Sequence, residues 1–291
     1  MSFVHNRKTT FGDVLNYSAL GLISLISLFP FFYVLSISFT DPQTYVPLKF
    51  YIFPEKWSLS SYEFILSTRS FIDSLNSTIF VTVVGTLFNL LFTFTMAYGL
   101  TKKGVPGRKV FLGVVIFTLF FSAGIIPSYL LVRNLGLLNS YWSLIWPSLT
   151  NAWSLIVVKS FMDSIHPELE DSARIDGCSD LGVFVRIIIP LSMPAVAAFT
   201  LFFAVNHWNT YFNALIYISD TKKWTLQLLI KQLVVDADAS GIGQTSGNDA
   251  APPQETIRMA SIVLSMVPIL IVYPFLQRHF AKGVMLGSVK G

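Results

Sequence analysis

Charged residues and cysteine are both scarce in this sequence. Charged residues make up 12% of the 291 residues, against 53% for hydrophobic residues, whereas ordinary soluble domains are about 25% charged. The mean hydropathy is +0.61. The single cysteine, Cys178, excludes an internal disulfide and any cysteine-ligated zinc or cluster site. This composition predicts a polytopic membrane protein.

Motifs that would carry covalent chemistry are also missing. The sequence has no G-x-x-x-x-G-K-[ST] phosphate loop, no H-E-x-x-H pair and no G-x-S-x-G elbow. The glycine-rich stretch 240–247 lacks the required lysine, and the histidines lie on separate segments. No basic stripe is interleaved with aromatic residues, so nucleic-acid binding is not expected. We therefore expect a chain that is not an enzyme and holds no metal or cofactor.

Six apolar runs predict an all-α integral membrane protein with six transmembrane helices. The first run, Val14–Phe39, would form a helix of about 39 Å, which exceeds the roughly 30 Å hydrocarbon core. It is too long for a signal peptide, and no small-residue cleavage site follows it. The predicted spans cover about 14–39, 74–100, 110–132, 141–162, 191–218 and 256–276, between an amino-terminal segment 1–13 and a tail 277–291.

No aspartate or glutamate falls inside these apolar cores. A carrier driven by protons or sodium usually needs such groups at mid-span, so their absence favours a transport path driven by a separate ATPase. Six spans place both termini on one side of the membrane. Twelve lysines and arginines fall on the side of the termini and eight on the other, which predicts cytoplasmic termini in the cell membrane by the positive-inside rule.

One charged segment, Pro167–Pro190, interrupts the apolar second half of the chain. Each of its ionised side chains would cost about 2.5–3.5 kcal/mol at a bilayer centre, so the segment must lie in water or against a water-facing partner. Pro167 suits a first helical position, and Gly177 suits the residue just past a helix end. Ser179 can cap a second short helix that runs up to Pro190. The pattern predicts a helix, a tight turn and a second helix.

Residues Glu170 to Gly177, followed by Ile188-Ile189-Pro190-Leu191, resemble the cytoplasmic EAA loop of ABC importer permeases. The segment departs from the family pattern in detail, because Asp171 and Ser172 replace Glu-Ala, Cys178 replaces Ala and Ile189 replaces Leu. The tail from Gln277 to Gly291 is similar to that of MalG-type permeases of carbohydrate importers, and the likeness covers nearly the whole chain. It looks closest to permeases for complex or acidic oligosaccharides, of the pectin or alginate type.

The resemblance implies a MetI/MalG-like permease fold in which a coupling loop, 163–190, docks into a cleft of an ATPase subunit. The implied function is that of a permease subunit in an ATP-driven importer of an oligosaccharide. The implied partners are a second homologous permease, two ATPase subunits that carry ATP and Mg, an extracellular solute-binding protein, the sugar, and membrane lipid. The implied coupling residues are Glu170, Asp171, Ser172, Ala173, Asp176 and Gly177, with tail contacts from Lys282 and Lys290.

The fifth predicted span carries an unusually polar run at 206–213. Such residues face a bundle interior or a wet cavity, since lipid leaves their polar atoms unsatisfied. They either line a translocation path or hydrogen-bond and pack between helices. The candidate path residues are Asn206, Trp208, Asn209, Tyr211 and Asn213. Two other functions stay open: an importer permease for a non-sugar solute, and a membrane scaffold or channel without an ATPase partner.

Overall fold

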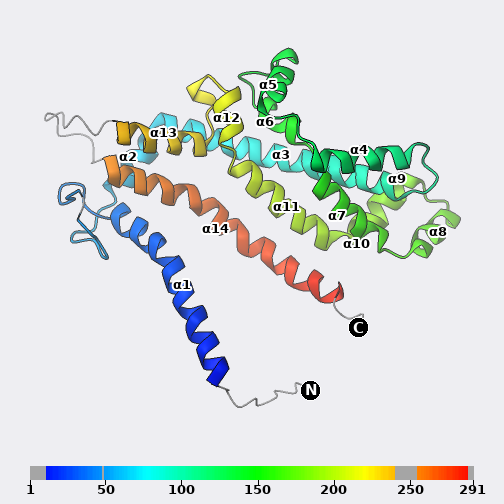
Figure 1. Cartoon of the computed structure of the whole chain (residues 1–291), viewed down its shortest axis with the longest axis horizontal. Helices are drawn as coiled ribbons and strands as arrows, with labels where there is room; N and C mark the ends of the chain where they lie inside the picture. Colours follow the sequence, from blue (N-terminus) through cyan, green and yellow to red (C-terminus); the bar gives the residue numbers. More distant parts are fainter. Residues whose placement is uncertain (1–10, 48, 240–253, 288–291) are drawn as a thin grey trace. The chain divides into compact units, whose positions relative to one another are not determined.

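The computed structural model describes residues 11–47, 49–239 and 254–287 (Figure 1). The described residues form helices and connecting segments without a strand, and one isolated antiparallel bridge pairs Thr40 with Trp57. The chain divides into two compact units, residues 1–68 with 233–264 and residues 69–232 with 265–291. Each unit is described by itself below.

The first unit contains α1 (Phe11–Ser38), α2 (Ser60–Ser67) and the beginning of α14 (Gln254–Gly287). Helix α1 is apolar and solvent-exposed along most of its length, and only its last turn is buried. Helices α2 and α14 are joined by a hydrogen bond of 3.0 Å from the Ser61 hydroxyl to the Thr256 hydroxyl. The exposure of α1 fits a helix whose surroundings are lipid or another subunit.

The second unit is built around α3 (Arg69–Thr101), which packs most extensively against α7 (Ala152–Asp163) and α11 (Met193–Trp208) (Figure 1). Two apolar clusters lie along α3, the first near its carboxyl end and the second around its middle. Besides the segment 167–191 and α14 from residue 265 on, the other elements are α4 (Arg108–Phe120), α5 (Ile125–Asn134), α6 (Trp142–Ile145), η1 (Trp146–Ser148), α12 (Phe212–Tyr217), η3 (Thr221–Lys223) and the first half of α13 (Leu226–Ala239). Residues 233–239 of α13 belong to the first unit.

Small and polar residues form the buried face of α3, mostly at four-residue spacing, which keeps them on one side of a helix. They include Ser74, Thr78, Gly85, Asn89, Thr93 and Ala97. A Cβ placed on Gly85 would lie 2.5 Å from Nε2 of His207 on α11. Because that position has no side chain, the His207 ring can lie against the α3 backbone, as in close helix packing inside membranes.

The helices subdivide some of the predicted spans. By length and composition α1, α3 and residues Glu255–Val272 of α14 can each cross a membrane, and the pair Asp180–Leu191 and Met193–Trp208, bent by 80°, is a fourth candidate. Range 110–132 is not one helix, because α4 and α5 are separated at 121–124, where Gly124 has a φ of +81°. Range 141–162 is likewise divided among α6, η1 and α7. The six-span arrangement stays a prediction.

At two of the interruptions in the second unit, side chains from other parts of the chain hydrogen-bond to the residues where a helix ends. Where η1 gives way to α7, the Asn89 side-chain amide donates to the Ser148 carbonyl, and the Thr93 hydroxyl donates to the Thr150 hydroxyl at 3.0 Å. Where α11 gives way to α12, the Thr225 hydroxyl donates to the Thr210 carbonyl at 2.7 Å. A broken helix is tolerated in an apolar setting only when its freed backbone groups are satisfied in this way.

Candidate functional site: the coupling segment

The first helix of the charged segment, α8, covers Pro167–Ile175, which confirms the predicted start at Pro167. Its end is a Schellman motif, in which Gly177 N donates to Arg174 O at 3.0 Å and Cys178 N donates to Ala173 O at 2.9 Å. Gly177 has a φ of +81°, a conformation that costs about 1–2 kcal/mol for a residue with a Cβ. The predicted turn at Gly177 is therefore confirmed.

The second helix begins at the predicted cap, where the Ser179 hydroxyl accepts from Gly182 N at 3.3 Å. It consists of α9 (Asp180–Val183), a π-helical turn η2 (Phe184–Ile188) and α10 (Ile189–Leu191). Pro190 lacks an N–H, and in a regular helix its ring would clash with the carbonyl four residues earlier. The π turn before it accommodates this clash. The chain then bends by 80° into α11.

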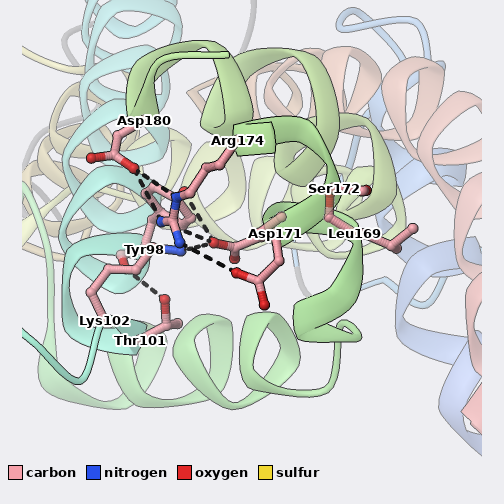
Figure 2. A network of polar contacts seen from close by, with 9 residues as sticks. Tyr98, Thr101, Lys102, Leu169, Asp171, Ser172, Arg174 and Asp180 are labelled. Carbon is pink, nitrogen blue, oxygen red and sulfur yellow. Dashed lines mark hydrogen bonds and ion pairs between the residues drawn. The ribbon is translucent and has the colours of Figure 1, made fainter. Parts of the chain in front are cut away.

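Glu170 and Ala173 face the body of the second unit. The Glu170 carboxylate pairs with the ammonium of Lys102, one residue beyond the end of α3, and the two side chains are only 17% and 24% exposed. The Lys102 ammonium also lies 4.0 Å from the ring centroid of Tyr98 (Figure 2), whose hydroxyl is 3.5 Å from the Glu170 carboxylate. Ala173 packs against the apolar cluster at this end of α3. Glu170 thus fixes α8 to α3.

Arg174 connects the two helices of the segment. Its guanidinium donates to the Asp180 carboxylate at 3.1 Å and lies 3.6 Å from the Asp171 carboxylate (Figure 2). It also lies 3.6 Å from the Glu170 carboxylate. The hydrogen bond to Asp180 raises the already high pKa of Arg174, so the guanidinium stays charged throughout the physiological range. The helix–turn–helix is therefore held as a preformed element.

The opposite face of α8 is open to solvent. The predicted coupling residues Asp171, Ser172, Asp176 and Gly177 are all exposed. Ile175 is 86% exposed and Leu181 also projects an uncovered apolar side chain. Sequence reasoning missed these two residues, although Ile175 lies three and four positions after Ser172 and Asp171 and therefore on their helix face. The predicted set is thus divided between an inward pair and an outward, water-facing surface.

The polar run of the fifth predicted span is also divided. Trp208 is buried, its indole N–H donates to the Ser265 carbonyl at 3.1 Å, and it lines an apolar cavity of about 410 Å³. Tyr211 is half-buried against the second apolar cluster. These two placements favour packing. Asn206, Asn209 and Asn213 are exposed, and Gln227, which sequence reasoning missed, donates to Asn209 at 3.5 Å.

The two tail candidates are not tested by these contacts. Helix α14 continues through the predicted end of the sixth span to Gly287, so Lys282 is helical. Lys290 lies outside the described residues.

A family model described as "Binding-protein-dependent transport system inner membrane component" matches residues 9–286. The chain belongs to this family. The permease is 47% identical to Protein LplC of Bacillus subtilis, over 99% of this chain and 98% of that protein. It is 45% identical to the polygalacturonan/rhamnogalacturonan transport system permease protein YtcP of the same organism, over 98% and 100%.

A solved structure has the same fold. The permease superimposes with a TM-score of 0.83, at 33% identity, on a chain from the crystal structure of a bacterial ABC transporter involved in the import of the acidic polysaccharide alginate, over 96% of this permease and 100% of that chain. The predicted resemblance to importer permeases and the all-α membrane fold are therefore confirmed.

Proposed function

We propose that this permease forms half of the translocation path of an ATP-driven importer for an acidic oligosaccharide. A second, homologous permease supplies the other half, a solute-binding protein delivers the sugar from outside, and two ATPase subunits bind ATP and Mg. The chain itself catalyses no covalent step. The alternatives are an importer permease for a non-sugar solute and, from another class, a scaffold or channel.

The observation that carries this proposal is the two-sided construction of α8. Its inward side is held by Glu170 and Lys102 against the end of α3, while its outward side presents Asp171 and Ile175 to solvent. A charged surface with an exposed apolar side chain on a rigid support is suited to docking a soluble subunit. A scaffold without an ATPase would have no use for such a surface.

The mechanism follows from how the segment is attached. If the two ATPase subunits move together on binding nucleotide, the docked α8 would move with the subunit that holds it. The Arg174–Asp180 contact makes α9 follow α8, and the bend before α11 carries the displacement into the helix that packs along α3. The bundle then rocks between inward-open and outward-open arrangements, which is the usual alternating-access motion of transporters.

The substrate class rests on two supports. The chain is similar to a permease named for polygalacturonan and rhamnogalacturonan, and to a transporter involved in the import of alginate. These substrates are polysaccharides that contain acidic sugars. Asn206, Asn209 and Asn213 expose neutral amides in the fifth predicted span. Amides donate and accept hydrogen bonds with sugar hydroxyls, and neutral groups can release an anionic sugar more readily than arginine or lysine would.

The test is reconstitution of the complete importer in proteoliposomes. We expect uptake of a labelled oligogalacturonide that requires both the binding protein and ATP, and little uptake of a neutral maltooligosaccharide of equal length. ATP-dependent uptake of the neutral sugar alone would overturn the acidic specificity. Failure of the permease to co-purify with any ATPase subunit would overturn the importer function itself.

A further inference from the structure

The connection between α1 and α2 forms a closed loop. Its arms are joined at the base by Asp41 N donating to Lys56 O and Ser58 N donating to Phe39 O, both at 2.9 Å. Inside the loop, Tyr51 is only 2% exposed. Its hydroxyl accepts a hydrogen bond of 2.9 Å from Val46 N. The loop therefore has a small core of its own, and the orientation of its outer side chains is defined.

This loop turns back along α1. The ring of Phe50 stacks on Phe29 and Tyr33 of α1, with ring centroids 5.8 and 5.4 Å apart. Phe29 lies roughly 13 Å before the carboxyl end of the helix at 1.5 Å per residue. The tip of the loop therefore lies alongside α1, well before the carboxyl end of that helix.

The depth of Phe50 in the bilayer can be estimated from the length of α1. Its 28 residues extend about 42 Å, and centring them on a hydrocarbon core of about 30 Å leaves about 6 Å outside at each end. Tyr33 then lies at about the hydrocarbon boundary, and Phe29 lies several Å below it. Phe50, which contacts both, is placed at the boundary between headgroups and acyl chains.

The exposed side chains at the tip are apolar, while the charges nearby are paired. Phe53 is 76% exposed and Ile52 is 64% exposed. Lys49 pairs with Glu55, and Lys56 pairs with Asp41 at 2.6 Å, so these four residues carry no net charge. Uncovered apolar side chains with balanced charges suit the lipid interface, whereas a soluble partner is usually met by complementary charge.

We propose that residues 50–53 insert into the membrane interface as a lipid anchor for the carboxyl end of α1. The side chains of Phe50, Ile52 and Phe53 reach the acyl-chain boundary, and the backbone stays at headgroup level, where its polar groups find partners. That residues 50–53 insert into the outer leaflet of the membrane follows from the predicted topology, in which the loop after α1 lies outside the cell. The insertion itself rests only on α1 crossing the membrane.

The experiment measures the depth of a nitroxide attached to a single cysteine in the complete importer in liposomes. In a Cys178→Ala background, in which this permease has no other thiol, Phe53→Cys and Ile52→Cys are the probes. Gln43→Cys, exposed at the base of the same loop, is the matched control. We expect oxygen, which concentrates in lipid, to reach the labels at 52 and 53 far better than a water-soluble nickel chelate does. The label at residue 43 should instead be reached better by the nickel chelate than by oxygen.

Three other outcomes would overturn the proposal. Free access of the nickel chelate to residue 53 would place the loop in water. Exclusion of both reagents would place it against the second permease. Access of the chelate that disappears when the binding protein is added would make the loop a protein-docking surface. Sugar uptake is not measured in this experiment, so the result can contradict the lipid anchor without contradicting the proposed function.

Discussion

At the scale of single residues, the Glu170–Lys102 ion pair attaches α8 to the end of α3 in the second unit. Substituting Lys102→Gln leaves the Glu170 carboxylate with only Arg174 at 3.6 Å as a cationic partner. Losing the partner of a half-buried charge costs about 1–3 kcal/mol. We expect sugar uptake per ATP hydrolysed to fall several-fold in proteoliposomes, because a displacement of α8 would then move α3 less.

Lys103→Gln is the matched control, since Lys103 is the exposed neighbour of Lys102 and surface substitutions cost little. The reversed pair, Lys102→Glu with Glu170→Lys, should recover part of the lost coupling. Equal behaviour of the two single lysine variants would show that the ion pair plays no part in transmission.

Gly85 makes a second residue-scale prediction. A methyl group there would lie 2.5 Å from the buried His207 ring, and overpacking of this kind costs about 1–3 kcal/mol. We expect Gly85→Ala to lower the thermal midpoint of the purified permease by several degrees. Gly99→Ala, on the same helix with open space around its Cβ, should be neutral or stabilising by up to about 1 kcal/mol. Similar shifts in both variants would contradict the packing of α11 on α3.

The sequence predicted the local structure of the coupling segment, residues 167–191, well, because its signals are local. Pro167, Gly177 and Ser179 each impose a backbone conformation or a cap by their own chemistry, and all three occupy the predicted positions. The direction of Glu170 could not be predicted, because its partner Lys102 is far away in the sequence and lies just after the end of α3. The coupling roles of these residues stay a prediction.

At the scale of elements, the exposed face of α8 is the feature that an ATPase subunit would cover. Ile175 is 86% exposed, so Ile175→Ser removes apolar contact area from a docked partner without disturbing the permease. Central apolar residues of an interface commonly contribute more than 1 kcal/mol. We expect the affinity of the ATPase subunits for the permease in detergent to fall about tenfold, with an unchanged thermal midpoint of the permease alone.

Leu135→Ser is the control for this prediction, because Leu135 is an exposed apolar residue after α5 rather than in the coupling segment. It should leave ATPase binding unchanged. A loss of binding in the Leu135 variant but not in the Ile175 variant would move the docking surface away from α8.

Apolar runs locate helices but do not show where a helix is interrupted. The range 110–132 is mostly apolar, yet α4 and α5 are separated at 121–124, just before Pro127 in the first turn of α5. The interruption before α7 is stabilised by Asn89, which is distant in the sequence, and the interruption after α11 is stabilised by Thr225 from the segment before α13. Hydropathy alone carries no information about such partners, which is why helices are divided within three of the predicted spans.

At the scale of the whole molecule, the positions of the basic residues predict which side of the membrane each loop occupies. Lys103 lies in the basic turn after α3 and Gln43 lies in the loop after α1, and both are exposed. In a Cys178→Ala background, a membrane-impermeant maleimide should label Gln43→Cys in right-side-out vesicles and Lys103→Cys only in inverted vesicles. The coupling segment is tied to the same end of α3 as Lys103, through Lys102. Labelling of Lys103→Cys from outside would therefore also remove α8 from the reach of a cytoplasmic ATPase.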